Sequence, residues 1–137
     1  MLTVQKYSKE RHLPLLKEWA KSWEYDYPWD FLPSHGWIAY SEDCVLDRNT
    51  PLACIMMREC ENQTALIDLL LTPKDMLTRG LYRDGVGVAM VEAEHWGKVN
   101  GYKFIMAMTL IPQIADFAKT AGFKAWSTIA LWRISNG

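Results

Sequence analysis

The hydrophobic pattern changes its period several times along the chain, and each change predicts a new element. Apolar and polar residues alternate from Leu2 to Tyr7, as in a strand with one buried face. Ser8 then offers a helix N-cap, and apolar residues recur at helical spacing as far as Trp23. We expect Pro14 in the first turn of this helix, because a proline further inside removes a backbone hydrogen bond.

Aromatic residues crowd the next segment, which Pro28 and Pro33 keep irregular. They are Trp19, Trp23, Tyr25, Tyr27, Trp29, Phe31 and Trp37. Rings at this density could line a substrate pocket, because a few rigid aromatic side chains define its shape. They could equally cover one edge of the core, and the sequence leaves both alternatives open.

The middle of the chain predicts three strands, at residues 36–40, 52–57 and 65–71. Residues 47–51, between the first two strands, have the composition of a turn. The third strand is almost entirely apolar, which is typical of a strand buried on both faces. Pro73 ends it, since proline cannot donate to the hydrogen-bond ladder.

A second helix follows, because the apolar and small residues from Val86 to Gly97 fall on one helical stripe. Gly101 is a suitable stop for it, and residues 104–108 again predict a strand. A short helix opened by Pro112 and closed by Gly122 comes next.

A last strand at residues 125–134 completes the predicted order. This order predicts a mixed α/β (α+β) domain, in which one sheet is flanked by helices. The strand–helix–strand unit at residues 65–108 is expected to be a parallel crossover.

Composition narrows the class of protein. Half of the 137 residues (50%) are hydrophobic and 23% are charged, which excludes a disordered chain and suits a single domain over residues 1–137. The net charge of -1 gives no general attraction to nucleic acid or to a membrane surface, so we expect neither as a partner. No apolar run approaches the ~20 residues of a membrane-spanning helix, and the N-terminus lacks a signal-peptide pattern, so a cytoplasmic location is expected.

The cysteines do not suggest a disulfide framework or a metal site. There are three, Cys44, Cys54 and Cys60, and none forms a Cys-x-x-Cys pair. The histidines are scattered, whereas a zinc site needs clustered nitrogen and sulfur ligands, so no metal is expected. We therefore expect free, reduced and mostly buried thiols.

Two glycines form the most informative motif. Gly85 and Gly87 stand between a buried strand and an amphipathic helix, where backbone N–H groups can approach a bound anion. Arg83 could add a charged donor to the same phosphate. The motif has neither the third glycine of a dinucleotide-binding turn nor the Gly-Lys-Ser/Thr of a P-loop.

The wider segment resembles the central motif of the GNAT superfamily of N-acetyltransferases. Gly85-Val86-Gly87 is followed by an amphipathic helix, the Gly101-Tyr102 break and a strand, which is the order of that motif. Residues 69–73 are similar to the family's strand-plus-proline, and residues 118–123 to its short helix ending in Gly-Phe. The resemblance is specific over residues 65–123 and topological before them.

This resemblance implies a mostly antiparallel central sheet and a site for acetyl-coenzyme A as cosubstrate. It implies that the pyrophosphate lies on the backbone N–H groups of Arg83, Asp84, Gly85, Val86, Gly87 and Val88. The pantetheine arm would pair with the strand edge near Leu69 and Leu71. The amine acceptor would enter from the other side, between the aromatic segment and the strand that contains Trp37.

The sequence departs from the family pattern at three places. Tyr82 stands where the family usually has Gln or Arg, and residues 74–81 form an insert before the glycines. Ala118 stands where the family often has the tyrosine that protonates the departing thiolate. The third departure leaves the retention of activity open.

Asp68 is the candidate general base, because it is the lone charge in residues 65–71 and acetyl transfer requires an amine without its proton. Its side chain could instead emerge at a sheet edge or pair with a neighbouring cation. Glu59 and Glu61 are weaker candidates beside a turn, and His95 is expected to be solvated.

Other groups carry less weight for catalysis. Tyr82 or Tyr102 could replace the missing acid, although no motif places either of them. Cys54 and Cys60 lack the histidine or carboxylate pattern that marks an activated thiolate.

The sequence therefore predicts an N-acetyltransferase that moves an acetyl group from acetyl-coenzyme A to a primary amine of a small molecule or a protein. The alternative is a GNAT-fold protein with weak or no catalysis that binds a protein partner, for which exposed rings are suited. A plain nucleotide-phosphate binder explains only the glycines. A homodimer through the last strand is also possible, with Trp126 and Trp132 at the contact.

Overall fold

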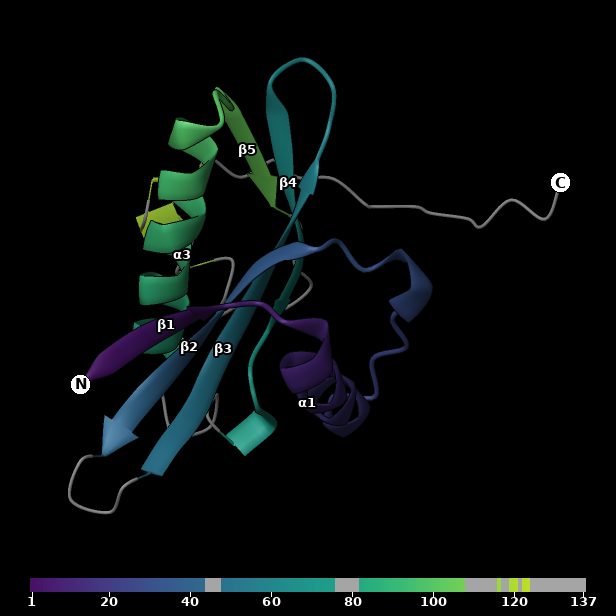
Figure 1. Cartoon of the computed structure of the whole chain (residues 1–137), viewed down its shortest axis with the longest axis vertical. Helices are drawn as coiled ribbons and strands as arrows, with labels where there is room; N and C mark the ends of the chain where they lie inside the picture. Colours follow the sequence, from purple (N-terminus) through teal and green to yellow (C-terminus); the bar gives the residue numbers. More distant parts are fainter. Residues whose placement is uncertain (44–47, 76–81, 108–115, 117–118, 121, 124–137) are drawn as a thin grey trace, which may run out of the picture.

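The computed structural model describes residues 1–43, 48–75, 82–107, 116, 119–120 and 122–123. Its strands form one sheet in the order β1-β2-β3-β4-β5, antiparallel except for the parallel pair β4 and β5 (Figure 1). Their bounds are Leu2–Lys6, His35–Asp43, Arg48–Glu59, Thr64–Leu71 and Phe104–Ala107. The sheet is therefore mixed and mostly antiparallel, as predicted.

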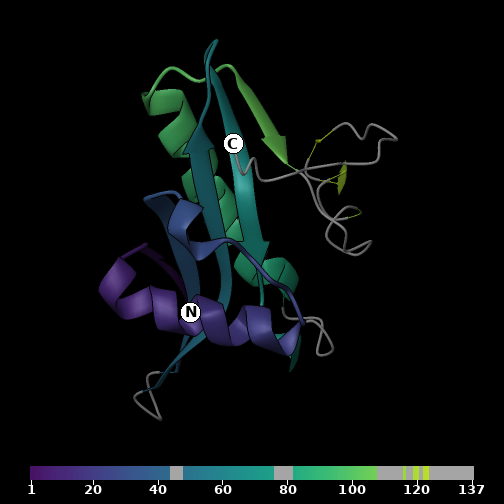
Figure 2. The same cartoon turned by 90° about the vertical axis from the view of Figure 1, so that its right-hand side faces the viewer.

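Two long helices cover opposite faces of the sheet. Helix α1 (Lys9–Ser22) lies across one face and α3 (Tyr82–Val99) along the other (Figure 2). A short 3-10 helix, η1 (Trp29–Phe31), follows α1. Helix α3 connects two parallel strands, which confirms the predicted parallel crossover. No helix in the described part of the chain is long and apolar enough to cross a membrane.

Each face of the sheet has its own hydrophobic core. The core under α3 contains Trp37, Ala39, Ala53, Ile55, Met57, Ala65, Ile67, Val86, Ala89, Met90 and Ala93. The core under α1 contains Leu16, Trp19, Ala20, Tyr27, Ile38, Cys54, Met56, Leu69 and Leu71. Strand β3 supplies buried residues to both cores without interruption from Leu52 to Met57.

The strand that is buried on both faces is β3, whereas the sequence predicted β4. Buried and half-buried residues alternate along β4, because β3 and not β4 lies in the middle of the described sheet. Two other local predictions are wrong. Pro14 lies inside α1 and not in its first turn. Proline has no N–H to donate to the carbonyl of Glu10, one turn earlier, but Glu10 is exposed, so water can reach that carbonyl. Pro51 belongs to β3, opposite Tyr40 at an irregular register.

The two predicted helix stops have the expected backbone. Gly101 has φ 78° and Gly122 has φ 98°, in the region that favours glycine. The amide of Gly101 donates to the Lys98 carbonyl and that of Tyr102 to the Gly97 carbonyl, as in a Schellman motif. The predicted helix at residues 112–121 and strand at 125–134 lie almost wholly outside the described residues.

At the start of α1, the side chain that bonds to the backbone is that of His12 and not that of the N-cap residue Ser8. The Ser8 side chain makes no capping bond, but the Ser8 backbone N–H donates to Nδ1 of His12 at 2.8 Å. The ring is buried, and its Nε2 has no hydrogen-bond partner among the residues that the structure describes. Burial, followed by the charge of Arg11, lowers the pKa of His12, which favours the neutral ring that an accepting Nδ1 requires.

A lowered pKa in the folded state makes stability depend on pH. As pH falls, the unfolded chain binds the His12 proton before the folded protein does, because its pKa is higher. The contribution of neutral His12 to the free energy of unfolding is therefore complete above the ordinary pKa of 6.5. It is lost as pH falls from there through the lower pKa of the folded state. We expect the free energy of unfolding, measured with urea, to fall between about pH 7.5 and about pH 5.5. His12→Gln, which keeps an acceptor without titrating, should lose less over this interval.

His95→Gln is the matched control, because His95 is exposed on α3. It should keep the pH dependence of the unmodified protein. Parallel losses in His12→Gln and the unmodified protein would show that His12 does not cause the effect.

Gly85 lets α3 lie close to the sheet. A Cβ atom at this position would stand 2.6 Å from Cβ of Leu52 and 3.4 Å from Cβ of Ala53, both on β3. Leu52 Cβ is fixed to the backbone, so the helix or the strand would have to move. At Gly97, near the other end of α3, the nearest atom is the flexible Ile105 Cδ1 at 3.3 Å.

The two glycines therefore predict opposite effects of the same substitution. Alanine in a helix gains about 0.5–1 kcal/mol over glycine, but overpacking a core costs about 1–3 kcal/mol. We expect Gly85→Ala to lower the free energy of unfolding and Gly97→Ala to leave it unchanged or raise it. Urea denaturation of both variants checks this, and equal effects would contradict the close packing of α3 on Leu52.

Candidate active site

Strand β4 contains a β-bulge at Asp68. Met57 pairs with Ile67 and Met56 pairs with Leu69, which leaves Asp68 with no residue opposite it on β3. The bulge changes the face to which the following side chains point. Ile67 belongs to the core under α3, whereas Leu69 belongs to the core under α1.

The described pairing of β4 with β5 ends at the residue before the bulge. The parallel register runs from the pair Thr64 and Phe104 to the pair Ile67 and Ala107. In the described part of the chain, the rest of β4 pairs only with β3. Leu69 and Leu71 lie in this stretch, and their side chains are buried in the core under α1.

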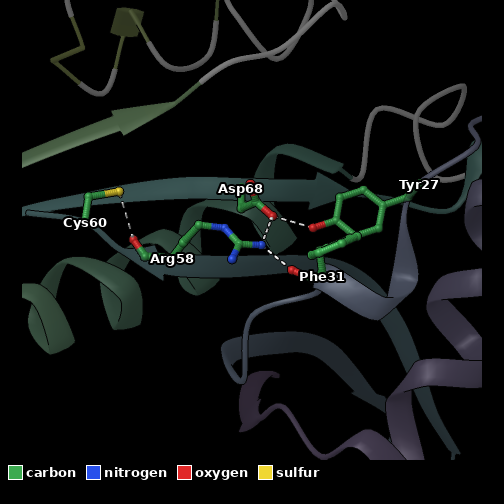
Figure 3. A network of polar contacts seen from close by, with 5 residues as sticks. All are labelled: Tyr27, Phe31, Arg58, Cys60 and Asp68. Atoms are coloured by element: carbon green, nitrogen blue, oxygen red, sulfur yellow. Dashed lines mark hydrogen bonds and ion pairs between the residues drawn. The ribbon is translucent and has the colours of Figure 1, made fainter. Parts of the chain in front are cut away.

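The carboxylate of Asp68 is held by two side chains from distant parts of the sequence (Figure 3). The Tyr27 hydroxyl donates a short hydrogen bond to Oδ2 of Asp68. The guanidinium of Arg58, on β3, contacts the same oxygen through Nη2 at 3.1 Å and also donates to the Phe31 carbonyl. The structure thus shows the pairing with a neighbouring cation that was the alternative to a catalytic role for Asp68.

The two partners differ in their electrostatic state. Burial, followed by the hydrogen bond to Asp68, raises the pKa of the Tyr27 hydroxyl well above its usual range, so it stays a neutral donor. The hydrogen bond to Asp68 raises the pKa of Arg58, which stays charged. The ion pair is only partly buried: 39% of the Arg58 side chain and 20% of the Asp68 side chain are exposed.

The aromatic segment lies beside this network. The Tyr27 ring has two aromatic neighbours. Its centroid is 6.0 Å from that of Tyr25 and 5.0 Å from that of Trp29. Trp23 Nε1 donates to the carbonyl of Thr72, just beyond β4, at 2.7 Å. Some rings belong to the core, but Tyr25 and Phe31 are 45% and 61% exposed. The structure therefore confirms the core alternative for the buried rings, whereas the pocket alternative stays a prediction for the exposed ones.

Trp37 does not belong to this aromatic wall. Its side chain lies in the core under α3, with its ring 5.8 Å from the ring of Trp96. The network of Asp68 lies on the α1 face, where Tyr27 is part of the core. The neighbouring residue of β2 on that face is Ile38. The strand of Trp37 was predicted to form one wall of the acceptor site. The Trp37 ring cannot belong to such a wall on the α1 face, because it points to the other face of the sheet.

The predicted phosphate loop lies inside α3. Because this helix is described from Tyr82, its hydrogen-bond pattern pairs the amides of Val86, Gly87 and Val88 with carbonyls one turn earlier. The expectation that both glycines precede the helix is wrong, and close packing on Leu52 accounts for Gly85. Arg83 and Asp84 are in the first described turn of α3.

The remaining candidates lie elsewhere or are engaged. Glu59 is 3.6 Å from His35 Nε2, and Glu61 is exposed in the turn before β4. Tyr102 stacks on Trp96, and His95 is exposed as expected. Among the described residues, no group of three or more histidine, cysteine or acidic side chains could hold a metal ion.

The two described cysteines differ in exposure. Cys54 is buried, and burial raises the pKa of its thiol, so it is a poor nucleophile. Cys60 is exposed, contrary to the expectation of mostly buried thiols. Both are free, and Cys44 lies outside the described residues. Ala118, at the position of the missing family tyrosine, also lies outside them.

Sequence reasoning missed the contacts of Arg58 and Tyr27 with Asp68. Arg58 pairs with Leu66 across the β3–β4 hairpin, two residues before Asp68. Opposite charges at diagonal positions of neighbouring strands often pair, so this spacing was an available signal. Nothing in the sequence pattern distinguishes Tyr27 from the rings around it.

Comparisons with known proteins give the fold. No family model matches the sequence, and no curated protein matches it. Among solved structures, the chain is similar to a GNAT-family acetyltransferase from Streptococcus pneumoniae TIGR4, with a TM-score of 0.66 at 12% identity, covering 100% of both chains.

Two further structures extend this likeness to enzymes with a stated substrate. Glucosamine-6-phosphate N-acetyltransferase from Arabidopsis thaliana has a TM-score of 0.62 at 9% identity, covering 98% of this chain and 99% of that one. An aminoglycoside N-acetyltransferase in complex with CoA has a TM-score of 0.58 at 13% identity, with 97% and 99% covered. The chain therefore has the fold of the GNAT acetyltransferases.

Proposed function

We propose that this protein is an N-acetyltransferase that transfers an acetyl group from acetyl-coenzyme A to a primary amine of a small molecule or a protein. The observation that carries the proposal is the bulge at Asp68. It sets a carboxylate beside a stretch of strand edge that no described residue pairs with, within a GNAT fold. The similar aminoglycoside N-acetyltransferase was solved with CoA, which supports this cosubstrate.

Two features would hold acetyl-coenzyme A. The backbone edge of β4 near Leu69 and Leu71 can pair with the amide groups of the pantetheine arm. The first described turn of α3, at Arg83, Asp84 and Gly85, would place the pyrophosphate at the positive end of the helix dipole. The amides of Val86, Gly87 and Val88 would contribute only through the helix dipole, because the helix already uses them. The Asp84 carboxylate weakens the attraction of this turn for phosphate.

Asp68 would act as the general base. Tyr27 and Arg58 occupy Oδ2, which fixes the orientation of the carboxylate and leaves Oδ1 without a hydrogen-bond partner among the described residues. The amine nitrogen attacks the thioester carbonyl, the C–N bond forms and the C–S bond breaks. The amine proton passes to Asp68, directly or through water, and then to the departing thiolate.

Tyr27 would orient the base and would not protonate the thiolate. A phenolate is a stronger base than a thiolate, since ordinary pKa values are about 10 for tyrosine and about 8.5 for cysteine. The raised pKa of Tyr27 widens this difference, so proton donation from Tyr27 to the thiolate is unfavourable. The proton released by the amine can serve the thiolate without a separate acid.

One observation favours the second candidate, a non-catalytic protein that binds a partner. Tyr25 and Phe31 expose much of their rings, as anchor residues of protein interfaces do before binding. Both candidates could bind acetyl-coenzyme A, so turnover is what distinguishes them.

We expect the purified protein to bind acetyl-coenzyme A in calorimetric titration and to release free thiol when a suitable amine is added. Desulfo-coenzyme A is the control, because it lacks the reacting thioester. Binding without thiol release for any of a broad panel of amines would favour the partner-binding candidate. Absence of binding would contradict the proposed enzyme.

Asp68→Asn tests the base directly. Loss of a general base lowers the rate by about 10²- to 10⁴-fold, so we expect a fall of that size in kcat/KM. Affinity for acetyl-coenzyme A should stay the same, because the proposed contacts are made by the backbone. Glu61→Gln, which removes an exposed acid from the turn before β4, should keep full activity. Equal activity of both variants would exclude Asp68 as the base.

A further inference from the structure

We infer that the acceptor carries a carboxylate next to its amine, as an α-amino acid with a large apolar or aromatic side chain does. This inference rests on the proposed function. It follows from the pair formed by Arg58 and Asp68, which offers a negative oxygen and positive donors to one ligand.

Arg58 has hydrogen-bond donors to spare. A guanidinium has five N–H groups, and the contacts of Arg58 with Asp68 and with the Phe31 carbonyl both use Nη2 (Figure 3). Arg58 also interacts with the Tyr27 hydroxyl, so three contacts with described residues stand against five N–H groups. The side chain is 39% exposed, so a carboxylate arriving from solvent can reach it.

The charges of the pair select the ligand. Because Asp68 is 3.1 Å from Arg58, the two charges nearly cancel for a ligand at some distance. An amine with a single positive charge gains at Asp68 and loses at Arg58. A ligand with an amine at Oδ1 of Asp68 and a carboxylate at Nη1 of Arg58 gains at both positions.

The surroundings of the pair favour an apolar side chain on that ligand. Arg58 is bonded to the backbone of Phe31, whose ring is 61% exposed. Tyr27 is hydrogen-bonded to Asp68, and its ring centroid lies 6.0 Å from that of the exposed Tyr25. Exposed aromatic surface next to polar recognition groups is the composition of a small-molecule site.

Acidic residues in the same segment favour a different ligand. Glu24, Asp26 and Asp30 alternate with the rings and are exposed, so their field attracts a cationic amine. Solvent and salt screen exposed charges, whereas Arg58 and Asp68 are partly buried and act at contact distance. The decarboxylated amine is therefore the competing acceptor, and a direct comparison decides between them.

The experiment compares tryptophan with tryptamine, and phenylalanine with phenethylamine, as acceptors of acetyl groups from acetyl-coenzyme A. In each case the amine nitrogen forms the amide bond, the C–S bond breaks, and the amine proton goes to the thiolate. A charge-assisted hydrogen bond to the carboxylate corresponds to about 10- to 100-fold in kcat/KM, so the amino acids should be preferred by that factor. A preference for the decarboxylated amines would overturn the inference and leave the proposed function intact.

Variants of Arg58 give the second measurement. In Arg58→Gln the preference should disappear, and Arg58→Lys should restore part of it. The ratio of the two acceptors within one variant does not depend on the fraction of folded protein, so a loss of stability does not imitate the effect. Lys17→Gln, which removes an exposed cation from α1, should keep the full preference.

Other outcomes are also decisive. Binding of acetyl-coenzyme A without acetylation of either member of the pairs would overturn this inference alone. Failure to bind acetyl-coenzyme A at all would remove the proposed function, and this inference with it. An unchanged preference in Arg58→Gln would show that Arg58 does not recognise the carboxylate.

Discussion

The single extra residue in β4 is the constraint on which the rest of the site depends. A strand with an uninterrupted register would keep Ile67 and Leu69 on one face of the sheet. The bulge at Asp68 separates them, so that β4 contributes to the core under α3 before it and to the core under α1 after it. The described pairing of β4 with β5 ends at the residue just before the bulge. Burial of both cores therefore fixes the place of the bulge, and with it the place of the Asp68 carboxylate.

The network around Asp68 joins this place to the segment that follows α1. Arg58 connects Asp68 with the Phe31 carbonyl, Tyr27 binds the same carboxylate, and Trp23 binds the backbone beyond β4. A partly buried ion pair contributes little net stability when intact, but removal of one partner leaves a charge poorly solvated. The network therefore matters less for net stability than for geometry, because it holds the exposed rings next to the carboxylate.

Local patterns predicted the fold well and the site less well. The change from a strand period to a helix period at residues 65–108 was enough to predict the parallel unit of β4, α3 and β5. The bulge could not be predicted, because it depends on how β3 and β4 pair and not on either strand alone. The glycines were misinterpreted for a related reason. Gly85 permits both a phosphate contact and a close helix, and only the position of Leu52 distinguishes them.

Gly85 is explained by the packing of α3 on Leu52, so the proposed function depends less on the acetyl-coenzyme A half of the site and more on the acceptor half around Asp68. A glycine required by the packing of α3 would be present with or without a phosphate, so it no longer counts in favour of acetyl-coenzyme A. The acceptor half depends on different observations. A carboxylate could have been packed into either core only at a large desolvation cost, and the structure instead keeps it partly exposed, with Oδ2 bonded and Oδ1 without a partner among the described residues. A guanidinium has more N–H groups than the contacts that the described residues make with Arg58. A ligand with both charges would complete this arrangement of acceptor and donors.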